Sequence, residues 1–210
     1  MSPVTEASAR ATVQRFAPGA PAAASLPGDF VLTHGKAWTS AVIRFGQRLR
    51  FWKRGDRRYT HWNHVAVFVD EEGQIVEALG HGVRERNIAD YQGTERHVVR
   101  LSASDEDREQ MVAFACHSID EEYGYVSIAS IGLSLLTGGK LIFGVAGQKI
   151  CSSLVARTLE RAGFVFTFEP SHAMPADLAR EFKVPAGGDK GTPPPEAAPR
   201  THRKRCSSNR

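Results

Sequence analysis

The segment 64–79 constrains the fold more than any other part of this 210-residue chain. Residues 65–69 are all apolar, which is typical of a central strand buried on both faces. An Asp-Glu-Glu-Gly turn follows at 70–73, and residues 74–79 return as a second strand. In the simplest register, the numbers of residues paired across this turn add up to about 143. The segment therefore predicts a β-hairpin at the centre of a sheet.

Two polar residues interrupt this apolar hairpin. His64 opens the first strand, and Glu77 lies within the second. The register makes them diagonal neighbours on one face, within reach of each other's side chains. A buried carboxylate without a partner is costly, so we expect Glu77 to accept a hydrogen bond from His64. Such a pair fits two roles equally: a base with its orienting group, or a polar contact that holds the hairpin together.

Cys151 begins a stretch with helical periodicity. Apolar and small residues recur on one face, and Gly163 is a natural stop. A cysteine at a helix N-terminus lies beside unpaired backbone N–H groups and the positive end of the helix dipole, which favour a thiolate. A buried core cysteine is the alternative interpretation. If Cys151 faces the second ring nitrogen of His64, the three residues form a nucleophile, a base and an orienting group.

The composition and the distribution of Pro and Gly along the chain predict one domain with two tails. Residues 1–26 read as a flexible leader, 27–183 as the folded domain, and 184–210 as a disordered basic tail rich in Pro and Gly. The tail holds six basic and two acidic residues, so it accounts for the net charge of +4 and leaves the body neutral. Within the domain we expect helices over 37–47 and from 175, a strand over 164–168, and a buried, glycine-broken apolar stretch over 126–146.

The three cysteines form an odd set, which does not suggest a disulfide framework. We expect Cys116 to be a core residue and Cys206 a free thiol in a reducing compartment. Residues 1–27 contain no long apolar run typical of a secretory signal. These features predict a cytoplasmic protein, with peripheral membrane association as a further option.

The order and spacing of these segments resemble a known family. His64 opening a strand, Glu77 on the next strand and a later helix starting Cys-Ser-Ser-Leu-Val resemble the circularly permuted branch of the NlpC-type papain-like cysteine hydrolases. That branch includes YiiX-like bacterial proteins and, more distantly, lecithin:retinol acyltransferase. Segments 27–32, 76–78, 82–83, 99–101 and 175–178 also match, so the resemblance covers roughly residues 27–182.

The resemblance implies an α+β, permuted papain-like fold, in which a central antiparallel sheet packs against helices and the catalytic Cys opens a helix. It implies that Cys151 is the nucleophile, His64 the general base and acid, and Glu77 the residue that orients His64, with His81 as the alternative orienting group. The candidate substrate-binding residues are Asp29, Trp38, Asn63, His81, Tyr123 and Ser152. Such enzymes cleave amide or ester carbonyls through an acyl-enzyme, so a peptidase or amidase acting on peptides, including cell-wall peptides, is expected. A lipid acyl hydrolase or acyltransferase is the alternative.

Two other classes of function remain open. Five histidines could supply metal ligands, namely His34, His61, His64, His81 and His172, but the chain lacks a His-Glu-x-x-His helix and a Cys-x-x-Cys pair, so we expect no metal and no cofactor. A non-enzymatic binding module could instead use the basic and aromatic segment 44–59 or the tail to contact an anionic ligand or a membrane surface. No nucleic-acid recognition motif accompanies that segment.

Overall fold

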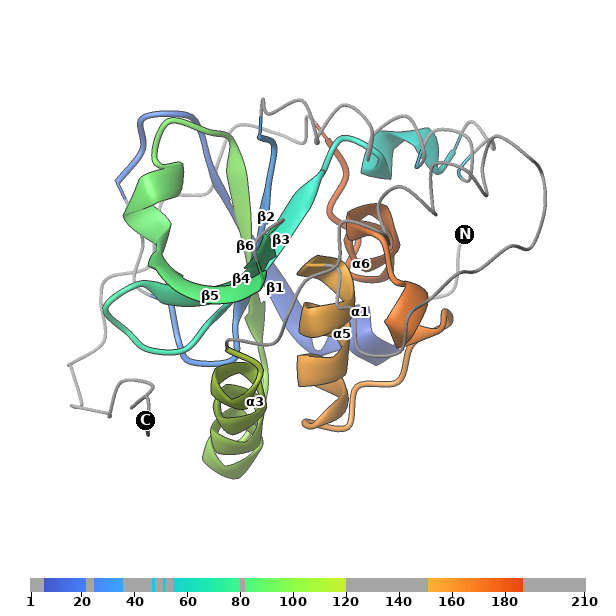
Figure 1. Ribbon diagram of the computed structural model, residues 1–210. Coiled ribbons are helices and arrows are strands. Elements are labelled where there is room, and N and C mark those ends of the chain that lie inside the picture. The colour runs from blue at the N-terminus through green and yellow to red at the C-terminus, as the bar shows by residue number, and fades with distance from the viewer. Residues whose placement is uncertain are drawn as a thin grey trace.

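The computed structural model describes residues 6–21, 25–35, 47, 51, 55–79, 82–119 and 151–186. Within these residues the chain is an α+β fold built on one six-stranded sheet (Figure 1). The strands are β1 (Ala11–Phe16), β2 (Phe30–Thr33), β3 (His64–Phe68), β4 (Gln74–Leu79), β5 (Gly82–Asn87) and β6 (Arg96–Leu101). The α-helices are α1 (Glu6–Ala9), α3 (Asp105–His117), α5 (Cys151–Glu160) and α6 (Pro175–Glu181), and the 3-10 turns are η1 (Arg57–Tyr59), η2 (Ile88–Tyr91) and η3 (Pro170–His172).

The sheet is antiparallel throughout, in the order β1-β6-β2-β3-β4-β5. The predicted hairpin is confirmed, because Val67 pairs with Val76 in the expected register. Its turn is stabilised by Asp70, whose Oδ1 accepts hydrogen bonds from the backbone N–H groups of Glu72 and Gln74 at 2.9 and 2.8 Å. Gly73 adopts φ +90°, which is why glycine suits this position.

The two faces of the sheet bury different clusters. The larger core lies on the side of α5, which contacts β3 and β4 and also packs on α3 and α6 (Figure 1). Apolar side chains of α5 such as Leu154, Val155 and Leu159 are fully buried there, as the periodicity of this segment predicts. A smaller cluster on the opposite face includes Phe68 and Ile88. Strand β3 is therefore buried on both faces, and α5 packs directly against the hairpin.

The predicted boundaries of the domain are too narrow. Residues 6–21 are not a flexible leader, because β1 pairs with β6 from Ala11–Leu101 to Phe16–Arg96. This edge strand alternates polar and apolar residues and buries only part of one face, which explains its weak sequence signal. At the other end, Val184 is buried and its carbonyl accepts a 2.8 Å hydrogen bond from Trp62 Nε1. The folded domain thus continues past residue 183, while residues 187–210 of the predicted tail lie outside the described residues.

Two local expectations are wrong. Residues 164–168 form no strand, because the chain turns at Gly163 and Phe164 is buried by packing against Phe182 rather than by strand pairing. Val165 beside it is 76% exposed. Cys116 is disulfide-bonded, so the expectation that the cysteines form no disulfide is also wrong. The predicted helix over 37–47, except for residue 47, and the apolar stretch over 126–146 lie outside the described residues.

Candidate active site

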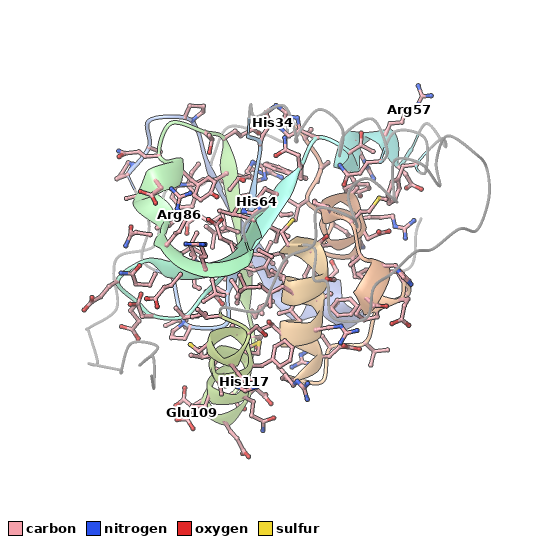
Figure 2. All side chains as sticks on the ribbon, in the orientation of Figure 1. His34, Arg57, His64, Arg86, Glu109 and His117 are labelled. Atoms are coloured by element: carbon pink, nitrogen blue, oxygen red, sulfur yellow. The ribbon has the colours of Figure 1, made fainter. Side chains whose placement is uncertain are left out.

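His64 and Glu77 form a short side-chain pair at one end of the hairpin. His64 Nε2 lies 2.6 Å from Glu77 Oε2, as the register predicted. The Glu77 side chain is 0% exposed and that of His64 is 14% exposed. A carboxylate in such a position requires a partner that carries positive charge, because burying an isolated charge is costly. His64 meets this requirement directly (His64 is labelled in Figure 2).

Cys151 is a second hydrogen-bonding partner of His64. It is the first residue of α5, its side chain is buried, and a side-chain hydrogen bond joins it to His64. Because His64 Nε2 is engaged by Glu77, the ring nitrogen that remains for the thiol is Nδ1. The packing of Leu154 and Val155 against the sheet sets the position of the helix. The three residues therefore stand in the order Cys151, His64, Glu77.

The environment of this group perturbs its proton affinities. Burial acts to lower the pKa of His64, but the hydrogen bonds with Cys151 and Glu77 outweigh burial and raise the pKa to about 10. Burial acts to raise the pKa of Glu77, but the hydrogen bond and the charge of His64 prevail, and the pKa lies below its ordinary value. At neutral pH the pair consists of an imidazolium and a carboxylate. The site thus provides a thiol next to a positively charged ring whose orientation is fixed.

Tyr91 and Arg86 complete the surroundings of Glu77, and the sequence analysis missed both. The Tyr91 hydroxyl donates a 2.6 Å hydrogen bond to Glu77 Oε2, and its ring stacks on that of His64 with centroids 5.7 Å apart. Arg86 Nε lies 3.7 Å from Glu77 Oε1. Burial, followed by the negative charge of Glu77, raises the pKa of Tyr91, so its hydroxyl stays protonated and donates. The pairing of Glu77 with Arg84 across β4 and β5 would have placed Arg86 on the same face, but no sequence signal indicated the path of η2 to Tyr91.

Two of the candidate substrate-binding residues, Asn63 and Ser152, form hydrogen bonds with the backbone. Asn63 forms two hydrogen bonds with the backbone of Gly35, at 2.9 and 2.8 Å, and so fixes the chain that follows β2. The Ser152 hydroxyl donates a 2.5 Å hydrogen bond to the carbonyl of Ala173. Asn63 directly precedes His64 and Ser152 directly follows Cys151 in the sequence. Their hydrogen bonds fix the backbone around the site.

Asp29 lies away from this group. It precedes β2 at the end where Phe30 pairs with Val67, whereas His64 pairs with Thr33 at the opposite end. Its carboxylate accepts hydrogen bonds from the backbone N–H of Leu101 and from Arg108, both buried, at 3.0 and 3.1 Å. The remaining candidates, Trp38, His81 and Tyr123, lie outside the described residues.

The other histidines make local contacts. The rings of His34 and His61 stack with centroids 4.0 Å apart, and His61 Nε2 lies 2.8 Å from Glu95 Oε2. Across the described ranges, no group of three or more His, Cys, Asp or Glu side chains has an arrangement that could hold a metal ion. In the basic and aromatic segment, the described rings of Phe51 and Tyr59 are buried in the core. They contribute to the fold, and the neighbouring residues 48–50 and 52–54 are not described.

No known protein-family model matches the chain, and no curated protein matches its sequence. Among the residues that the structure describes, no helix has the length and apolar character needed to cross a membrane.

Proposed function

We propose that the protein is a cysteine hydrolase that cleaves an amide or ester carbonyl through an acyl-enzyme. The observation that carries this proposal is the position of His64, which is hydrogen-bonded to Cys151 on one side and to the buried Glu77 on the other. A thiol that serves only as a core residue needs neither partner. Nucleophile, base and orienting group in this order are the arrangement that nucleophilic catalysis requires.

The reaction follows from the protonation states. The Cys151 sulfur, as a thiolate paired with the His64 imidazolium, attacks the carbonyl carbon and forms a C–S bond. His64 then gives its proton to the departing nitrogen or oxygen as the C–N or C–O bond breaks. In the second half-reaction, His64 takes a proton from water, the resulting hydroxide attacks the thioester, and the C–S bond breaks to release the acid and regenerate the thiolate–imidazolium pair. The backbone N–H of Cys151 would contribute to stabilising the oxyanion.

We also propose that the α+β fold is papain-like with a permuted order of its segments. A permuted papain-like fold, in which the histidine and the carboxylate precede the cysteine along the chain, is supported by the order of β3, β4 and α5 and by the docking of α5 against β3. A peptide or amino-acid amide is the substrate class that we propose.

The test combines labelling with a substrate panel. Purified protein is incubated with peptide, amino-acid amide, thioester and phospholipid substrates, and Cys151→Ala and His64→Ala serve as controls. We expect turnover of an amide or peptide that both substitutions abolish, and a thioester adduct that peptide mass spectrometry locates at Cys151. Turnover of the phospholipid alone would replace the peptide proposal with a lipid acyl hydrolase. Equal turnover by the unmodified protein and Cys151→Ala would overturn the proposal of a cysteine hydrolase.

A further inference from the structure

The two oxygens of the Glu77 carboxylate have unequal surroundings. Oε2 accepts both short hydrogen bonds, from His64 and from Tyr91, each at 2.6 Å. Oε1 is buried and accepts no hydrogen bond from any described residue. An unsatisfied buried oxygen costs free energy, so rotation of the carboxylate toward another donor would be favourable unless something prevents it.

Arg86 is the competing donor. Its Nε lies 3.7 Å from Glu77 Oε1, beyond hydrogen-bonding distance but within reach after a small movement. Arg86 is held in place by Asp90, whose Oδ2 accepts hydrogen bonds from Arg86 Nε and Nη2 at 3.0 and 2.8 Å. A carboxylate that turned to Arg86 would leave His64 Nε2 without its acceptor. The orientation of His64 thus depends on which cation Glu77 faces.

A single 3-10 turn controls both sides of this competition. η2 carries Tyr91, which binds Glu77, and Asp90, which restrains Arg86. The turn is anchored independently of the site, because Ile88 is buried in the smaller core and its N–H donates a 2.8 Å hydrogen bond to the carbonyl of Gly73. Asn87 caps the turn by accepting from the N–H of Ala89 at 2.9 Å.

We propose that Tyr91 is a positioning residue that keeps the Glu77 carboxylate turned toward His64, and that Asp90 assists by holding Arg86 away from it. This inference rests on the proposed function, since it concerns the residue that would orient the catalytic base. Tyr91 acts through Glu77, to which its hydroxyl donates a hydrogen bond. Among the residues that the structure describes, the charged and titratable groups around Glu77 and His64 are Cys151 on α5, Arg84 and Arg86 on β5, and Asp90 and Tyr91 on η2.

The direct test is Tyr91→Phe, which removes only the hydroxyl. The rate of Cys151 alkylation by iodoacetamide is measured between pH 5 and pH 9, and the adduct is assigned by peptide mass spectrometry. Without the Tyr91 hydroxyl, Glu77 turns toward Arg86 and the imidazolium loses stabilisation. We expect alkylation to slow and its pH profile to move down by roughly one unit, consistent with the loss of one hydrogen bond to a charged group. Tyr59→Phe is the matched control, because Tyr59 is also buried but is not among the residues that bond to Glu77, and its profile should match that of the unmodified protein.

A second variant separates positioning from a merely structural role. Arg86→Gln removes the competing cation, so the double variant Tyr91→Phe/Arg86→Gln should recover most of the alkylation rate lost in Tyr91→Phe. A loss of thermal stability with an unchanged pH profile in Tyr91→Phe would overturn the inference. So would a double variant that reacts no faster than Tyr91→Phe. Because alkylation needs no substrate, failure to find hydrolysis would count against the proposed function and leave this result intact.

Discussion

Replacing Glu77 with Gln should change the reactivity of Cys151 more than any other conservative substitution in the chain. Gln keeps the size and shape of the side chain and can still accept a hydrogen bond from His64 Nε2, which lies 2.6 Å from Glu77 Oε2. What it removes is the negative charge. Since the Glu77 side chain is 0% exposed, that charge acts on His64 with little screening by water.

The magnitude follows from the negative charge that is lost from this hydrogen bond. A hydrogen bond to a charged group contributes about 1.5–3 kcal/mol, and one pKa unit corresponds to about 1.4 kcal/mol. The Gln variant should therefore lower the pKa of His64 by roughly one to two units. The pKa of His64 is about 10 in the unmodified protein, where burial opposes the rise and the bonds with Cys151 and Glu77 cause it. Because the imidazolium stabilises the thiolate, alkylation of Cys151 should slow, and its pH profile should move down by the same roughly one to two units.

Stability gives a second readout with a defined sign. A histidine whose pKa is raised on folding stabilises the protein fully below its unfolded pKa, near 6.5, and this contribution is lost as the pH rises toward 10. We expect the free energy of unfolding to decrease over this window by up to about 1.4 kcal/mol per pH unit. Glu77→Gln should make this decrease smaller. Urea titrations at pH 6.5, 8 and 9.5 in a Cys151→Ala background isolate the contribution of Glu77, because thiol ionisation and the bond between Cys151 and His64 are then absent.

The chain offers a matched control in Glu95→Gln. Glu95 also forms a carboxylate–histidine pair, with Oε2 2.8 Å from His61 Nε2, but the pair is partly exposed and does not include Cys151. This variant should leave the pH profile of alkylation unchanged. The reasoning about Glu77 is refuted if Glu77→Gln also leaves the profile unchanged, or if both Gln variants shift it equally.

Three further substitutions test the framework by urea unfolding. Arg108→Met should cost about 3–5 kcal/mol, because it leaves the buried Asp29 carboxylate without its ion-pair partner, and it should not alter the pH profile of Cys151 alkylation. Burial lowers the pKa of His97 to about 4, so the free energy of unfolding should fall by about 2–3 kcal/mol between pH 7 and pH 4.5. In His97→Gln this decrease with falling pH should be smaller. Gly28→Ala should destabilise the protein, because Gly28 has φ +89° and an added Cβ would lie 2.4 Å from Met111 Cε; a stability equal to that of the unmodified protein would contradict the structure here.

The parts of the fold that could be predicted are those with a local physical cause. The hairpin register depends on one short turn, so the proximity of His64 and Glu77 followed from counting residues. The helix from Cys151 follows from its apolar periodicity, since one side of the helix has to be buried. Both features are determined by residues close together in the sequence.

The parts that were missed depend on contacts between distant segments. The edge strand β1 pairs with β6 across about ninety residues, and its own composition does not distinguish it from a polar leader. Conversely, residues 164–168 have the composition of a strand but pair with no strand among the described residues, and Phe164 is buried against Phe182 instead. Tyr91 reaches Glu77 only because β5 and η2 bend the chain back over the sheet, which no local pattern specifies.

The two halves of the candidate site depend on each other unequally. Glu77 is fully buried, and of its cationic neighbours only His64 donates a hydrogen bond to it, at 2.6 Å, whereas Arg86 is 3.7 Å away. The hairpin therefore supplies one of the two hydrogen bonds that favour the imidazolium, and Cys151 supplies the other. Helix α5 brings the thiol to the His64 ring, and the position of the helix depends on its own packing and on the bond from Ser152 to Ala173. Damage to the docking of α5 should consequently reduce the reactivity of Cys151 while the His64–Glu77 pair survives, whereas damage to Glu77 should affect both.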